Sequence, residues 1–285
     1  MEQFDTINKQ PRYLNGSTIE IINDTRPVKP PKHVFFDFDG TVSLIREGWQ
    51  KIMSSLIVEV LGNTGTDETE HELFDYAAGM IAETNGLQTI YQMIRLADEV
   101  TKRGAKPEEP LDYKHVFNRR LLDHIEDRLD SLRSGAAEPE TLTVPHIHDM
   151  LIALVDRGII LHLASGTDIE YVREEAHLLG VDIFFGNNIN GALDDYRSFS
   201  KKMVIEHIID EFNIPGDMLV GFGDGFVDIE TVKSVHGTAV AVASDETGRS
   251  GKVDDWKRKR LIKAGADIVI PDFRDFKELL RYLRL

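Results

Sequence analysis

The chain has 285 residues, enough for one large or two modest domains with a substantial core. Its 49 acidic residues outnumber 33 lysines and arginines, and the formal net charge of −16 disfavours nucleic acid and anionic membranes as partners. The absence of cysteine excludes disulfides and thiolate metal sites. The N-terminus has no basic segment followed by an apolar core, and the chain has no long apolar run. We therefore expect a cytoplasmic protein without signal peptide or membrane span.

Residues 1–32 are polar and rich in proline, with one strand-like piece at residues 17–22. The prolines before His33 favour an extended entry to the first core strand. We expect an N-terminal arm that packs over the domain. The alternative is an arm that mediates oligomerisation or binds a partner.

An apolar run at residues 34–36 is followed directly by Asp37-Phe38-Asp39-Gly40-Thr41. The run fits a buried strand, and Gly40 allows the chain to turn sharply where the strand ends. Because Asp37 and Asp39 are two residues apart on an extended backbone, their side chains lean the same way. Crowded carboxylates repel unless a cation joins them or one is protonated, and Mg²⁺ suits such an oxygen-only site.

Residues 44–140 show apolar residues at helical spacing throughout, with breaks at residues 62–66 and 103–110 and a long amphipathic helix at residues 112–133. From residue 141 the pattern changes to alternating helices and strands. Helices are expected at residues 143–156, 168–179, 201–212, 253–263 and 273–283, and strands at 159–163, 181–185, 218–222, 239–242 and 268–270. This βα alternation predicts a doubly wound parallel sheet of the α/β class.

Further polar residues follow the expected strands. Ser165 and Gly166 come after the strand at 159–163, where a hydroxyl, backbone N–H groups and a helix N-terminus could hold a phosphate oxygen. Asp224 follows the strand at 218–222, and Asp228 lies one helical turn further on, so both could ligate a metal.

Basic residues are candidates as well. Lys201 and Lys202 stand at a helix start, where lysine is poorly placed relative to the helix dipole, which hints at another task. The alternative is a pair of solvated lysines. Arg46 follows the first acids and either reaches a substrate anion or simply faces solvent. The basic run 257–260 is interpreted as a solvated helix face.

The first motif and the later ones, in this order, resemble the haloacid dehalogenase superfamily, in the phosphoglycolate phosphatase and β-phosphoglucomutase-like branch with an inserted helical cap. Beyond the N-terminal arm at 1–32, the resemblance implies a Rossmann-like core at 33–43 and 141–285 and a cap at 44–140. It implies that Asp37 is the nucleophile, Asp39 the general acid and base, and that Ser165 and Lys201, with Lys202 as the second choice, bind the phosphoryl group. Thr41, Gly166 and Arg46 are expected as additional phosphate or substrate contacts, and the resemblance implies that Mg²⁺ is held by Asp37, Asp39 through its carbonyl oxygen, Asp224 and Asp228.

The implied activity is magnesium-dependent hydrolysis of a small phosphomonoester through an aspartyl-phosphate. A phosphomutase is an alternative because it uses the same two acids, and a binding or regulatory protein that keeps the fold without turnover is another. Sugar phosphates, phosphoglycolate and nucleoside monophosphates all remain open as substrates. The expected partner is a small phosphorylated metabolite rather than a nucleic acid or a membrane, and the oligomeric state is open.

Overall fold

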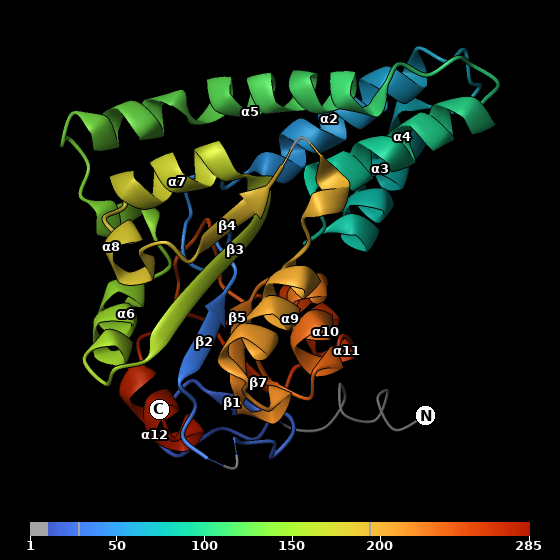
Figure 1. Cartoon of the computed structure of the whole chain (residues 1–285). Coiled ribbons are helices and arrows are strands. Elements are labelled where there is room, and N and C mark those ends of the chain that lie inside the picture. The colour runs from blue at the N-terminus through green and yellow to red at the C-terminus, as the bar shows by residue number, and fades with distance from the viewer. Residues whose placement is uncertain (1–10, 28, 194) are drawn as a thin grey trace.

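The computed structural model describes residues 11–27, 29–193 and 195–285. A seven-stranded sheet with the order β1-β7-β6-β5-β2-β3-β4 forms its centre (Figure 1). All paired neighbours run parallel except β1, which is antiparallel to β7. The strands are β1 (Glu20–Ile21), β2 (His33–Phe36), β3 (Ile160–Asp168), β4 (Ile189–Ala192), β5 (Leu219–Gly223), β6 (Thr238–Val242) and β7 (Ile268–Ile270).

Helices cover both faces of this sheet. In β2, Val34 and Phe36 point to one face and Phe35 to the other, and all three are fully buried because the strand lies in the middle of the sheet. The first face is packed by α6 (Ile147–Val155), α7 (Ile169–Leu178), α8 (Asp182–Phe185) and α12 (Phe276–Leu283). The second is packed by α9 (Lys201–Phe212), α10 (Phe226–Ser234) and α11 (Asp255–Lys263). The predicted doubly wound α/β class is confirmed.

Four further helices lie beyond the carboxyl ends of β2 and β3 (Figure 1). They are α2 (Trp49–Gly62), α3 (Glu70–Thr84), α4 (Thr89–Lys102) and α5 (Pro110–Arg133), and we call them the cap helices. A capping box starts α3, in which Thr69 and Glu72 satisfy each other's backbone N–H groups, and a proline in its first turn starts α5. The domain boundaries at residues 44 and 140 stay predictions.

The strand predicted at residues 181–185 is wrong. This apolar run forms the one-turn helix α8, whose Phe185 packs edge-on against Phe36 with ring centroids 6.0 Å apart. The next strand of the sheet is instead β4, which begins four residues after α8 and whose sequence Ile-Asn-Gly-Ala has weak β-propensity. Gly191 in β4 allows a close approach, because a Cβ there would lie 2.7 Å from the Cα of Ile169 at the start of α7.

The described part of the predicted arm packs onto the core. Strand β1 adds to the sheet edge beside β7, and Glu20 accepts hydrogen bonds of 2.5 and 2.6 Å from Arg258 of α11. Thr18 bonds to Asp275 at the start of α12. Residues 1–10 and 28 of that arm lie outside the described residues. Within the described ranges, no helix is both long and apolar enough to cross a membrane.

Candidate active site

The two pairs of motif acids meet because β2 and β5 are parallel neighbours. Asp37 follows β2 and donates a backbone hydrogen bond of 2.9 Å to Phe222 of β5, so the ends of the two strands are held together. Gly40 turns the chain at a φ of 77° and packs against the carboxylate of Asp224, where no Cβ would fit. The carboxyl edge of the sheet thus carries a group of acids, as expected for an open α/β fold.

Lys201 lies between two of these acids. Its Nζ is 2.6 Å from Asp37 Oδ1 and 2.6 Å from Asp228 Oδ1, and the side chain is buried. Ser200 caps the start of α9 by accepting a hydrogen bond of 3.1 Å from the N–H of Met203. The side chain of Lys202 is 62% exposed and pairs with Glu206. Of the two candidate lysines, the structure brings Lys201 to the acids.

A divalent cation fits the acidic cluster. Carboxylate oxygens of Asp37, Asp224 and Asp228 lie within 4.8 Å of one another, and an all-oxygen donor set is what Mg²⁺ prefers. Burial and the charge of Asp228 raise the pKa of Asp37, and burial raises the pKa of Asp228, although Lys201 opposes both rises. A bound cation would relieve this repulsion. The carbonyl oxygen of Asp39 as a ligand stays a prediction.

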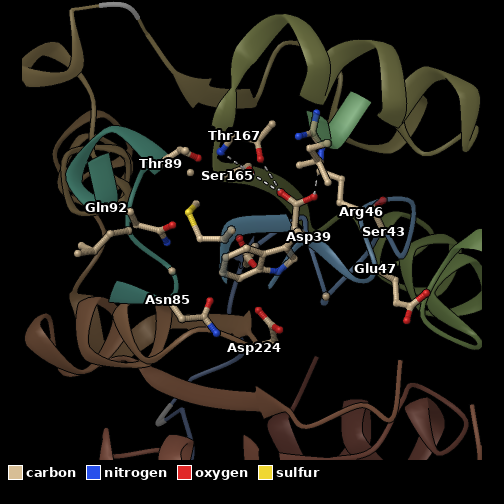
Figure 2. Close-up of a pocket in the computed structure, with 18 of the residues that line it drawn as sticks. Asp39, Ser43, Arg46, Glu47, Asn85, Thr89, Gln92, Ser165, Thr167 and Asp224 are labelled. Atoms are coloured by element: carbon tan, nitrogen blue, oxygen red, sulfur yellow. Dashed lines mark hydrogen bonds and ion pairs between the residues drawn. The ribbon is translucent and has the colours of Figure 1, made fainter. Parts of the chain in front are cut away.

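The side chain of Asp39 turns toward β3 rather than toward the other acids. Its Oδ2 accepts hydrogen bonds of 2.9 Å from Ser165 and 3.0 Å from Thr167 (Figure 2). Its Oδ1 has no hydrogen-bond partner in the described part of the chain and lies 3.8 Å from Nε of Arg46. Ser165 and Thr167 therefore fix the orientation of Asp39, and its Oδ1 is a buried oxygen that faces Arg46.

Arg46 is buried beside this pocket, so the interpretation of a solvent-facing arginine is wrong. Its guanidinium donates three hydrogen bonds of 2.6 to 3.1 Å to Glu175, a residue of α7 that is itself buried. Burial raises the pKa of Glu175, and the charge of Arg46 opposes that rise. Contact between Arg46 and a substrate anion stays a prediction.

Thr41 follows β2, whereas Ser165 and Gly166 lie within β3, which continues to Asp168 past the predicted strand end at residue 163. Thr41 donates a long hydrogen bond of 3.3 Å to Asp37 Oδ2. Gly166 packs closely against the loop between α3 and α4. A Cβ atom at this position would lie only 2.8 Å from the carbonyl oxygen of Leu87. In the same loop Gly86 packs against Gly225, where a Cβ would be 3.0 Å from Gly86 Cα. We call these contacts between Gly86, Leu87, Gly166 and Gly225 the glycine seam.

Sequence reasoning missed a second lysine at the acids. Lys257 Nζ is 2.8 Å from Asp224 Oδ2 and also contacts Glu246, and Arg260 donates to the Asp224 carbonyl oxygen. The solvated helix face predicted for this basic run is wrong for Lys257, which is 7% exposed. The available signal was its spacing, since Lys257 precedes the fully buried Leu261 by four residues and therefore shares its inward face.

A pocket of about 740 Å³, including its open mouth, joins these residues to the cap helices. From the sheet side it is lined by Asp37, Asp39, Ser165, Thr167, Lys201 and Asp224. From the cap side it is lined by Trp49, Met53, Asn85, Leu87, Thr89, Gln92, Phe117 and Leu121. This is the size and composition of a small-molecule site with charged groups at one end.

Fold and site together define a capped α/β protein with an acidic centre at the sheet edge. The sequence model of the haloacid dehalogenase-like hydrolases matches residues 31–236. The chain belongs to this family of hydrolases, as the order of its motifs predicted.

Several solved structures share the fold at low sequence identity. A predicted phosphoglycolate phosphatase from Haemophilus somnus 129pt is 16% identical, with 88% of this chain and 99% of that chain covered and a TM-score of 0.56. β-Phosphoglucomutase from Clostridium difficile is 13% identical, with 89% and 97% covered and a TM-score of 0.59. A predicted phosphatase from Clostridium acetobutylicum is 14% identical, with 89% and 100% covered and a TM-score of 0.56. No curated protein matched in a sequence search.

Proposed function

We propose that the protein is a magnesium-dependent phosphatase that hydrolyses a small phosphomonoester through an aspartyl-phosphate on Asp37. The observation that carries this proposal is the different setting of the two first-motif acids. Asp37 lies against Lys201 and the other acids, whereas Asp39 is held by Ser165 through one oxygen, and its other oxygen has no hydrogen-bond partner among the described residues and faces Arg46. A nucleophile and a proton donor therefore stand side by side.

In the first half of the reaction a carboxylate oxygen of Asp37 attacks phosphorus. The bond between phosphorus and the leaving oxygen breaks, and Asp39 Oδ1 gives its proton to that oxygen, so the alcohol leaves neutral. Lys201 balances negative charge on Asp37 and on the transferring phosphoryl group. Ser165 and Thr167 keep Asp39 in the orientation that this proton transfer needs.

In the second half a water molecule attacks the phosphorus of the aspartyl-phosphate. Asp39 takes the proton of this water, and the bond to Asp37 breaks to release inorganic phosphate and restore both acids. Mg²⁺, held by Asp37, Asp224, Asp228 and the Asp39 carbonyl oxygen, would supply positive charge that screens the anionic nucleophile from the anionic phosphate. The glycine seam brings the loop between α3 and α4 against Gly166 and Gly225 beside the reacting centre.

The test is phosphate release from p-nitrophenyl phosphate and from small phosphomonoesters, with and without Mg²⁺. We expect metal-dependent turnover that Asp37→Asn abolishes and that Asp39→Asn lowers about 10²- to 10⁴-fold. Lys201→Met should lower turnover strongly, while Lys202→Met, the matched control on the exposed side of α9, should leave it unchanged. Activity that survives in Asp37→Asn would refute the proposal.

The alternatives give different results in the same assay. A phosphomutase would return the phosphoryl group to a sugar phosphate and release little phosphate, and a non-catalytic protein would bind an ester without turning it over. A small phosphorylated metabolite as partner and a cytoplasmic location stay predictions from the sequence.

A further inference from the structure

Among the described residues, those that line the pocket from the cap helices and from the loop between α3 and α4 carry no charge. Trp49, Met53, Phe117 and Leu121 supply apolar surface from α2 and α5, and Asn85 and Gln92 supply amides from the region of α3 and α4. A leaving group that reaches this wall therefore meets apolar atoms and neutral polar groups.

The pocket's cations are already engaged. Among the described residues that line it, the cationic side chains are Lys201, which bridges Asp37 and Asp228, and Arg46, which is held by Glu175. The remaining charged groups at the pocket are carboxylates, including Glu47 and Glu246. A second anionic group on the substrate would lie near these carboxylates, and no cationic side chain among the described lining residues is left unpaired to neutralise it. Binding of such a substrate is therefore disfavoured.

Gln92 of the cap wall carries a buried polar atom that has no hydrogen-bond partner among the described residues. Gln92 is 4% exposed, its amide is directed into the pocket, and its Oε1 accepts no hydrogen bond from any described residue (Figure 2). Its Nε2 donates a hydrogen bond of 3.4 Å to the carbonyl oxygen of Thr84, which leaves the oxygen as the atom available to a ligand. A buried acceptor without a partner is unfavourable, so a donor on the substrate would be recognised here.

We propose that the substrate is the phosphomonoester of an uncharged alcohol that carries a hydrogen-bond donor for Gln92 and an apolar part for the wall of Trp49 and Phe117. This inference rests on the proposed phosphatase activity and narrows its substrate class. It favours hydroxylated esters over esters whose leaving group bears a carboxylate or a second phosphate.

The test uses two pairs of esters that differ in one group each. Phosphoglycolate and its amide differ in the charge of the leaving group, and 2-hydroxyethyl phosphate and propyl phosphate differ in the donor at similar size. We expect kcat/KM to be at least about tenfold higher for the amide than for phosphoglycolate, and about tenfold higher for the hydroxyl ester than for the alkyl ester. Equal or reversed preferences in the wild-type protein would overturn the inference.

Variants of Gln92 assign the donor preference to that side chain. Gln92→Leu should lower kcat/KM about tenfold more for 2-hydroxyethyl phosphate than for propyl phosphate, which removes the preference for the hydroxyl ester. Gln92→Glu is the matched control, because it keeps an acceptor oxygen at the same reach and should retain the preference for the hydroxyl. A preference that persists in Gln92→Leu would overturn the assignment, and the wild-type pairs decide the substrate class if that variant does not fold.

The inference can fail separately from the phosphatase activity. Turnover of p-nitrophenyl phosphate and its loss in Asp37→Asn report on the phosphatase alone. Binding of the ester pairs to Asp37→Asn, measured by calorimetry with Mg²⁺, reports on the leaving-group wall without turnover. We expect the amide to bind about tenfold more tightly than phosphoglycolate. Equal binding of the two, or no binding of either, would overturn the inference.

Discussion

Replacing Glu175 by glutamine should destabilise the protein strongly, because it leaves the charge of Arg46 buried. The two side chains are 2% and 6% exposed and share three hydrogen bonds of 2.6 to 3.1 Å. Glutamine offers a single acceptor oxygen and turns an N–H group toward the guanidinium. Removing one partner of a buried pair typically costs about 3–5 kcal/mol, and we expect about 3 kcal/mol because Asp39 stays 3.8 Å from Arg46.

The assay is the free energy of unfolding in urea, and α7 supplies its own control. Glu174 pairs with Arg133 at 2.6 Å, but the two side chains are 49% and 44% exposed, so Glu174→Gln should cost less than about 1 kcal/mol. Joint replacement by Arg46→Met and Glu175→Leu should recover most of the stability, since no unpaired charge remains. The reasoning is refuted if Glu175→Gln and Glu174→Gln lose similar amounts of stability.

Further changes test the fold. Burial lowers the pKa of His162 to about 4, so its stabilising effect is complete above the unfolded pKa of about 6.5 and is lost as the pH falls toward 4. Between pH 7 and pH 5 the wild type should lose about 2 kcal/mol more unfolding free energy than His162→Phe; an equal loss would contradict this. Gly79→Ala, in the middle of α3 with open space around it, should stabilise by about 0.5–1 kcal/mol in thermal or urea unfolding without changing turnover. Gly166→Ala should destabilise by about 1–3 kcal/mol in the same assays, and a gain of stability there would mean that the loop at Leu87 yields easily.

The sequence predicted the site best for residues that directly follow a strand, because the end of the strand places them at the carboxyl edge of the sheet. Asp37 and Asp224 follow apolar runs that become the parallel neighbours β2 and β5, so pattern and topology together bring them to one edge. Lys201 could be singled out because it starts a helix that its charge does not favour. These features depend on local periodicity, which a single sequence shows directly.

The errors arose where tertiary contacts override local pattern. The run at 181–185 looks like a strand by composition, yet a single helical turn buries Phe185 against Phe36. The pairing of Arg46 with Glu175 joins residues 129 positions apart and leaves no periodic trace. Lys257 was misread because charge alone suggested solvent, although the cluster around Asp224 provides enough negative charge to bury a lysine.

The glycine seam separates two properties of the cap that could otherwise constrain each other. At Gly86 and Gly225 the cap meets the core through backbone atoms, while most of the wall that faces the leaving group is made of side chains on the cap helices. Met53 and Leu121, which belong to that wall, take no part in the backbone contacts between Gly86 and Gly225. The contact between cap and core therefore depends on backbone shape at these glycines. Substitutions in the cap helices can change substrate preference separately from this contact.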